Sequence, residues 1–248
     1  MAILSEATNI KKLGQRNLWV LWGKSGCGKT HFIGTLPKPL LYIQIGDDGS
    51  NTIAEIEDAK DIDAIRAGSL ERLKQIAEEL KKDTKYASVA VDTFSMITNV
   101  WIDANAVQKK KKMTMQMWGD LKVETEELIK LYHDIAATHI VALSCHEAND
   151  TIEGMDDEVI PDFGPSTTKG SRIYLQGMAN YGIHFTKINK TVTNKATGEE
   201  KEVVKYAAHL GPNPYYWTKL QISDSVKVPD VVISPSYSKI VDIIKGGK

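Results

Sequence analysis

The stretch from residue 23 to residue 30 constrains the fold of this chain more than any other. It reads Gly23-Lys24-Ser25-Gly26-Cys27-Gly28-Lys29-Thr30 and fits the pattern of glycine, four residues, glycine, lysine, and serine or threonine. An apolar run at residues 18–22 precedes it, and a helix is predicted to begin at Lys29. A loop in this strand, loop and helix context is typical of a phosphate-binding loop.

The residue types of this loop account for the predicted chemistry. Glycines let backbone N–H groups approach an anion without a Cβ in the way. Lys29 would reach the outer phosphates, and the hydroxyl of Thr30 would ligate Mg²⁺. The alternative interpretation is a glycine-rich turn that binds nothing. Because every fixed position of the pattern is matched, the sequence predicts a site for a nucleoside triphosphate with Mg²⁺.

Composition narrows the class of protein. A length of 248 residues predicts a single domain, here 1–248, with a polar lead-in at 1–16. The formal net charge of −1 means that any nucleic-acid surface must be a local patch. Two cysteines, at 27 and 145, fit no disulfide or zinc framework. No apolar run approaches a membrane span, and the N-terminus lacks a signal-peptide core. We therefore expect a soluble cytoplasmic protein with no membrane partner.

The order of the predicted elements indicates the fold class. Strands and helices alternate as far as residue 144, and hairpin-type strands follow, with a long mobile loop expected over 147–172. This order predicts an α/β fold with a mostly parallel central sheet, helices on both faces and an antiparallel C-terminal extension. Strands are predicted at 18–22, 40–45, 87–92, 139–144, 183–188, 203–209 and 216–222, and helices at 29–36, 69–82, 94–107, from about 118 to 138, and at 234–244.

Four polar residues after predicted strands are candidates for the nucleotide site. Asp92 closes an apolar strand and would orient the Mg²⁺ shell, or alternatively would cap the following helix. Asp47 or Asp48 could polarise an attacking water, or could be turn residues. His146 could sense the γ-phosphate, or could be a partly buried histidine held by a neighbour. The ends of parallel strands meet at one edge of a sheet, so these residues are expected close to the loop.

The same order of motifs resembles a known family, the RecA-like core ATPases. The phosphate loop, the carboxylate after the second strand, Asp92 and the polar exit at His146 carry the resemblance, and Trp118-Gly119-Asp120 before a long helix is also typical. The similarity runs from about Leu18 to Ile244 and points to compact phage and prophage ATPases of single-strand annealing or recombination. It implies a RecA-like P-loop fold and ATP as the nucleotide. Relatives generally have Glu after the second strand, so the shorter aspartate here implies slow hydrolysis.

The resemblance also implies a binding surface for single-stranded DNA. In RecA-like proteins, loops after the third and fourth strand regions line a DNA channel, and here they correspond to 108–118 and about 148–172. A run of four lysines offers phosphate contacts, and Trp118 offers base stacking. The alternative for the lysine run is a solvated surface. The candidate DNA-binding residues are Lys109, Lys110, Lys111, Lys112, Trp118, Lys169 and Arg172.

Members of this family form rings or filaments, so self-association is implied as well. A basic residue of one subunit would then reach the γ-phosphate of its neighbour, and Lys219 is the candidate, with an ordinary exposed lysine as the alternative. A single-strand-binding protein is a further candidate partner, and the host would be a bacterial cell if the chain is phage-encoded. The sequence leaves three alternatives open: a nucleotide-gated interaction module with little hydrolysis, a DnaB-like helicase or packaging motor, and a small-molecule kinase.

Overall fold

The computed structural model describes residues 16–46, 50–56, 59–153, 159–193 and 200–247. Its strands are β1 (Asn17–Trp22), β2 (Leu40–Gln44), β3 (Ile62–Arg66), β4 (Ser88–Asp92), β5 (Ile140–Cys145), β6 (Glu147–Glu153), β7 (Val159–Pro165), β8 (Tyr181–Thr193), β9 (Glu200–His209), β10 (Lys219–Leu220) and β11 (Val231–Ile233). Its helices are α1 (Lys29–Ile33), α2 (Ser50–Ala54), α3 (Leu70–Leu80), α4 (Ile97–Ile102), α5 (Met115–Ile135), α6 (Lys169–Met178) and α7 (Tyr237–Ile244), with the short 3₁₀ helices η3 (Ala59–Asp61) and η4 (Phe94–Met96) and the π-helix η5 (Asp103–Val107).

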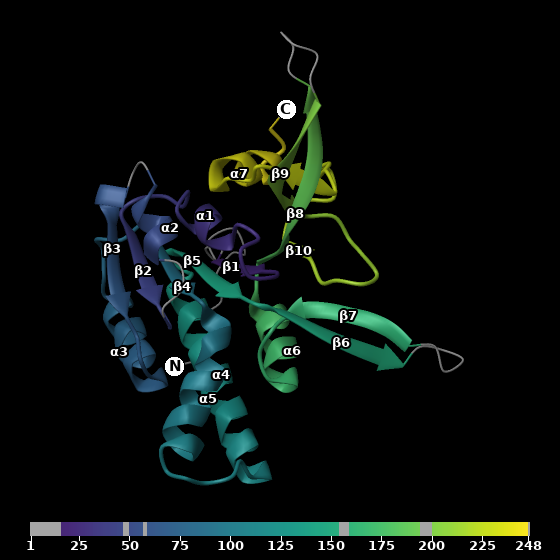
Figure 1. The fold of residues 1–248 in the computed structure, drawn as a ribbon. Coiled ribbons are helices and arrows are strands. Elements are labelled where there is room, and N and C mark those ends of the chain that lie inside the picture. Colours follow the sequence, from purple (N-terminus) through teal and green to yellow (C-terminus); the bar gives the residue numbers. More distant parts are fainter. Residues whose placement is uncertain (1–15, 47–49, 57–58, 154–158, 194–199, 248) are drawn as a thin grey trace, which may run out of the picture.

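A central sheet organises the molecule (Figure 1). Its strand order is β11-β9-β8-β1-β5-β4-β2-β3, and β10 pairs with β8. The strands from β8 to β3 run parallel, whereas β9, β10 and β11 add an antiparallel extension. The predicted fold class is therefore confirmed. Strand β1 lies between β5 and β8, and its last residue, Trp22, is in register with Cys145 and His184. The loop after β1 thus begins at the C-terminal edge of the parallel strands, where open α/β sheets bind ligands.

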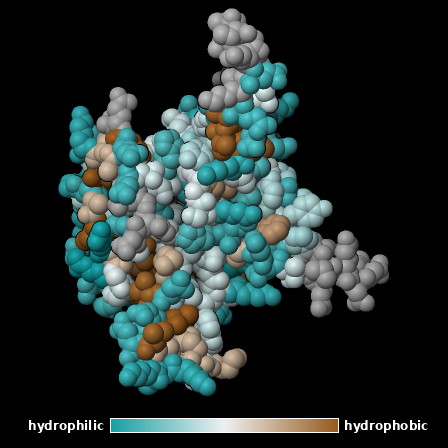
Figure 2. Space-filling view, viewed as in Figure 1, coloured by the Kyte–Doolittle hydropathy of each residue, from teal (hydrophilic) through white to brown (hydrophobic). Residues whose placement is uncertain are grey.

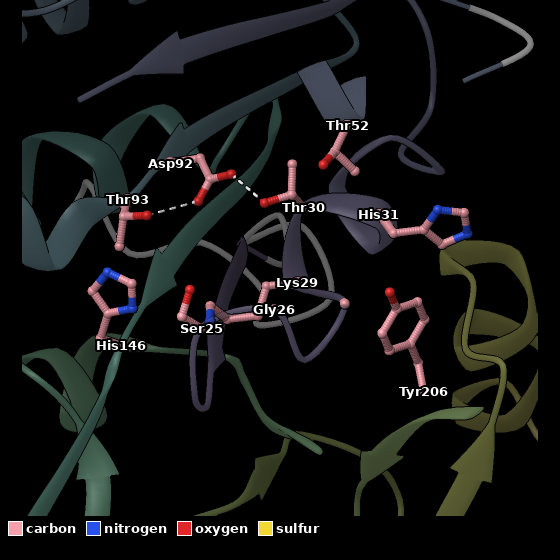
Figure 3. Close-up of a pocket in the computed structure, with 11 residues that line it drawn as sticks. Ser25, Gly26, Lys29, Thr30, His31, Thr52, Asp92, Thr93, His146 and Tyr206 are labelled. Atoms are coloured by element: carbon pink, nitrogen blue, oxygen red, sulfur yellow. Dashed lines mark hydrogen bonds between the residues drawn. The ribbon is translucent and has the colours of Figure 1, made fainter. Parts of the chain in front are cut away.

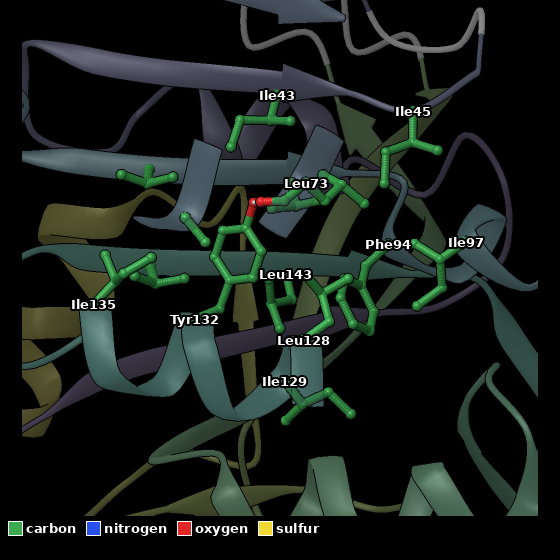
Figure 4. Packing of buried hydrophobic residues seen from close by; sticks show 14 of the residues in the cluster. Ile43, Ile45, Leu73, Phe94, Ile97, Leu128, Ile129, Tyr132, Ile135 and Leu143 are labelled. Atoms are coloured by element: carbon green, nitrogen blue, oxygen red, sulfur yellow. Dashed lines mark hydrogen bonds between the residues drawn. The ribbon is translucent and has the colours of Figure 1, made fainter. Parts of the chain in front are cut away.

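Strand β1 shows why helices cover both faces of the sheet. Leu18, Val20 and Trp22 belong to the core beneath α3, α5 and α6, whereas Trp19 and Leu21 belong to the core beneath α1 and α7. Buried parallel strands read as continuous apolar runs because each face needs its own hydrophobic layer. Figure 4 shows the first layer, where side chains of α5 such as Tyr132 pack between α3 and the sheet.

The segment 147–172 differs from the prediction of a long mobile loop. Strands β6 and β7 pair as an antiparallel two-stranded sheet in which Glu147 is in register with Pro165, and α6 begins at Lys169. Figure 1 shows this ribbon extending away from the central sheet. The residues of β6 are mostly polar, and Pro161, Gly164 and Pro165 interrupt β7, so neither segment has the period-2 pattern that predicts a strand. Gly170 and Gly177 likewise obscure the helical pattern of α6.

Several smaller elements were missed or misplaced by the sequence patterns. Strand β3 lies at the sheet edge and has only exposed or half-buried residues, which leaves it without a clear apolar signal. The helix predicted at 94–107 consists of η4, α4 and η5 in succession. The strand predicted at 216–222 is reduced to the two residues of β10, and the last helix begins at Tyr237 after the capping hydroxyl of Ser236. Within the described ranges, none of the helices is long and apolar enough to cross a bilayer.

Candidate functional site

The loop after β1 has a backbone that only glycine adopts easily at its key positions. Gly23 has a φ of 147°, and a Cβ there would lie 2.3 Å from the carbonyl oxygen of Phe185. Gly28 has a φ of 98°, and a Cβ there would lie 2.7 Å from the ring of Tyr206. Left-handed backbone and close neighbours both exclude larger residues. The loop is therefore shaped by β8 and β9 as well as by its own sequence.

Lys29 occupies the centre of this loop. Its side chain is 6 % exposed, and Nζ donates hydrogen bonds to the carbonyl oxygens of Gly23 and Lys24, each at 2.9 Å. Nζ also lies 3.7 Å from Sγ of Cys27. Burial is the main reason why the pKa of the Cys27 thiol is raised, so Cys27 stands beside Lys29 as a neutral thiol. The loop thus holds one buried positive charge.

Asp92 is the second fixed element of the site. It ends β4, is 2 % exposed and accepts hydrogen bonds from four hydroxyl groups of four segments. Oδ2 accepts from Thr30 at 2.7 Å and from Tyr42 at 3.0 Å, and Oδ1 accepts from Thr93 at 3.1 Å and from Ser144. The capping position of the following turn is held by Thr93, so the alternative of Asp92 as a helix cap does not apply. The carboxylate is anchored beside the last residue of the loop motif.

A cavity of about 230 Å³ opens over these groups. Figure 3 shows Asp92, Thr93 and His146 at one end of this cavity and His31 and Tyr206 at the other end. The lining residues are Ser25, Gly26, Gly28, Lys29, Thr30, His31, Thr52, Asp92, Thr93, His146 and Tyr206. A concave site with backbone amides, one buried ammonium and one carboxylate fits a magnesium-bound polyphosphate, since Mg²⁺ takes a hydroxyl and a carboxylate together with phosphate oxygens.

Seven residues predicted for the nucleotide site line this cavity: Ser25, Gly26, Gly28, Lys29, Thr30, Asp92 and His146. Thr30, Asp92 and His146 lie together as expected, and the backbone N–H of His146 donates to Oγ of Ser95 at 2.8 Å. Asp47 and Asp48 lie outside the described residues. Sequence reasoning missed four residues that line the cavity, His31, Thr52, Thr93 and Tyr206. It also missed Lys187, whose Nζ lies 3.5 Å from the position of a Cβ on Gly26. Tyr206 and Lys187 belong to the predicted hairpin, but no local sequence pattern indicates how that hairpin lies against β1.

Two predicted residues are corrected by the structure. Arg172 is 4 % exposed, and its guanidinium pairs with Asp150 at 2.7 Å and Asp162 at 3.1 Å. It joins α6 to the β6–β7 ribbon and is not placed to contact DNA. Lys219 donates to the carbonyl oxygens of Gln176 at 3.1 Å and Gly177 at 2.8 Å. A cation at the C-terminal carbonyls of a helix is stabilising, so within its own chain Lys219 caps α6.

The other candidate DNA-binding residues are exposed. Lys109–Lys112 lie between η5 and α5, and the side chain of Trp118 on α5 is 42 % exposed. Figure 2 shows hydrophobic and hydrophilic side chains mixed at this end of the molecule, where Val107 and Met115 are also exposed. A second cavity, between α4, α5 and the start of α6, is lined by Trp118, Lys169 and His146 among others. His146 therefore borders both cavities.

Comparison with known families decides the family of this chain. The family model AAA_24, described as an AAA domain, matches residues 16–217. The chain belongs to this family of AAA domains. The family match, the sheet order and the phosphate loop together identify a P-loop nucleotide-binding domain of the ATPase class with a RecA-like fold. Among solved structures, the flagellar accessory protein FlaH from Methanocaldococcus jannaschii is similar, with 10% identity, a TM-score of 0.42, and coverage of 79% of this chain and 78% of that chain. A comparison with curated proteins finds no match.

Proposed function

We propose that this AAA domain hydrolyses ATP and binds single-stranded DNA, and that the bound nucleotide controls DNA binding in phage-type recombination or replication. The observation that carries the proposal is the hydrogen bond of 2.7 Å between Thr30 and Asp92 at the end of the phosphate loop. These two oxygens would hold Mg²⁺, which would neutralise charge on the β- and γ-phosphates. Lys29 would place its charge on the outer phosphates as phosphoryl transfer proceeds.

Hydrolysis also needs a residue that activates the attacking water. Asp47 and Asp48, the predicted candidates, follow β2, which pairs with β4 so that Gln44 is in register with Asp92. The C-terminal end of β2 therefore lies at the same sheet edge as Asp92. Turnover of ATP measured with and without single-stranded DNA tests the proposal. Stoichiometric binding with no turnover under either condition would instead favour a nucleotide-gated interaction module.

The two cavities that His146 borders support coupling between nucleotide and DNA. One cavity contains the phosphate loop and the other contains Trp118 and Lys169. A side chain that contacts both ligands can transmit a change at the γ-phosphate to the DNA surface, provided it has two arrangements. Self-association into a ring or filament in a bacterial host's cytoplasm belongs to the same proposal. Size measurements with ATP and DNA test it, and a monomer under all conditions would count against it.

The lysine run gives the sharpest test of DNA binding. We expect replacement of Lys109–Lys112 by glutamine to weaken single-strand binding and to reduce the slope of log affinity against log salt by up to about 3, at about 0.7 per phosphate contact. A matched control removes four exposed lysines near the β3 edge: Lys60, Lys81, Lys82 and Lys85. Fluorescence anisotropy over a salt series gives both values. Equal slopes for the two variants would show that the lysine run is a solvated surface.

A further inference from the structure

The nucleotide pocket has two chemically different ends. At one end, Thr30 and Asp92 are hydrogen-bonded to each other and His146 lies nearby. At the other end, beyond the phosphate loop, the cavity is lined by the rings of His31 and Tyr206 (Figure 3). A nucleoside triphosphate is polar and charged at its phosphates and flat and aromatic at its base. If the phosphates and metal take the Thr30–Asp92 end, the base lies toward the ring end.

The ring of Tyr206 is exposed and packs against the phosphate loop. Tyr206 is 38 % exposed, whereas Ala207 and Ala208, the next residues of β9, are fully buried. Its carbonyl oxygen accepts a hydrogen bond from the backbone N–H of Ser234 at 2.8 Å, and its ring packs on the backbone of Gly28. An aromatic ring held against a phosphate loop by its own strand is preorganised for a flat ligand.

The surroundings of Tyr206 favour a nucleotide over a purely structural contact. Tyr206 is in register with Lys187 on β8, so the hairpin brings a ring to Gly28 and an ammonium to Gly26 at the same time. The centroids of the Tyr206 and His31 rings are 6.2 Å apart, with 34° between their planes. Exposed aromatic faces beside a polyphosphate site are the usual means of holding a base, because every base has a π-face.

We propose that Tyr206, with His31 beside it, forms the surface that binds the base of the nucleotide. The inference rests on the proposed nucleotide function of the phosphate loop and adds the part of the site that recognises the nucleoside. Stacking of a base on an aromatic side chain predicts that Tyr206→Ala weakens Mg-ATP binding roughly 5- to 150-fold. Tyr206→Phe keeps the ring and should bind within about twofold of the wild type.

The test compares ATP with tripolyphosphate, which has the phosphates but no base. Titration calorimetry with each magnesium complex is performed on the wild type, Tyr206→Ala, Tyr206→Phe and a control, Val204→Ala, which alters another exposed residue of β9. We expect Tyr206→Ala to lose affinity for ATP and to keep its affinity for tripolyphosphate, while the control changes neither.

Three outcomes would overturn the inference. Unchanged ATP affinity in Tyr206→Ala would show that the ring does not touch the base. An equal loss for ATP and tripolyphosphate would show that the ring only supports the loop. A wild-type protein that binds neither ligand would overturn the proposed function and this inference with it, whereas the first two outcomes leave the nucleotide site standing.

Discussion

Replacement of Gly28 by alanine tests the packing of the phosphate loop quantitatively. Gly28 has a φ of 98°, and its new Cβ would lie 2.7, 2.9 and 3.2 Å from atoms of Tyr206. Left-handed backbone costs an L-residue about 1–2 kcal/mol, and displacement of a packed ring by an added methyl costs about 1–3 kcal/mol. We therefore expect Gly28→Ala to lower the free energy of unfolding by about 2–5 kcal/mol.

Gly26 provides a matched control in the same loop. It has a φ of 71°, and a Cβ there would lie 3.5 Å from Nζ of Lys187, an ordinary contact with the end of a flexible side chain. Gly26→Ala should therefore lose only the backbone contribution, about 1–2 kcal/mol. Urea denaturation followed by tryptophan fluorescence gives both values. In the double variant Gly28→Ala/Tyr206→Ala, the steric part of the loss should disappear.

The reasoning would be refuted if the two glycine variants lost equal stability, or if removal of the Tyr206 ring failed to rescue Gly28→Ala. Either result would mean that β9 does not shape the loop as the structure indicates.

Three further predictions concern buried polar groups. Asp92→Asn replaces a carboxylate oxygen that would ligate Mg²⁺ with an amide N–H₂ that faces hydroxyl donors. The affinity of this variant for ATP should therefore not change when EDTA removes magnesium, and a loss of affinity on addition of EDTA would contradict the prediction. Burial raises the pKa of Cys27 and raises that of Cys145 to about 12, so both thiols should react slowly with a disulfide reagent at pH 7 and quickly in urea; fast native labelling would be inconsistent. Burial lowers the pKa of His184 and His209. As the pH falls below about 6.5, the unfolded chain therefore binds more protons than the folded chain, so the free energy of unfolding should be constant above that pH and should decrease on acidification. The decrease should be smaller in His209→Gln. Equal decreases in the variant and the wild type would exclude His209 as a cause.

The sequence predicted those parts of the fold whose constraints are local. The glycines and Lys29 of the loop need a particular backbone, and the run from Leu18 to Trp22 is buried on both faces, so both are visible as patterns. Asp92 was recognisable because a carboxylate directly follows the apolar run Val89–Val91. In each case a few neighbouring residues contain the whole signal.

The remaining features depend on contacts between distant segments. From the sequence, Arg172 was interpreted as a surface cation, whereas in the structure it lies on α6 and pairs with two aspartates of the β6–β7 ribbon. Lys219 was misread because its partners are backbone carbonyls 43 and 42 residues away, at Gln176 and Gly177. Tyr206 reaches the loop through a hairpin register that no local pattern encodes. Tertiary placement, which neither propensity nor periodicity describes, decided each of these roles.

The most direct test of the central claim is calorimetric titration of Mg-ATP into the wild type, Lys29→Ala and Lys24→Ala. Lys29 donates its hydrogen bonds inside the loop, whereas the side chain of Lys24 is exposed and lies outside the cavity lining. We predict one site per chain in the wild type, at least about a tenfold loss in Lys29→Ala because a charge-assisted contact is removed, and a small change in Lys24→Ala. Undiminished binding by Lys29→Ala would contradict the claim that residues 23–30 hold the triphosphate.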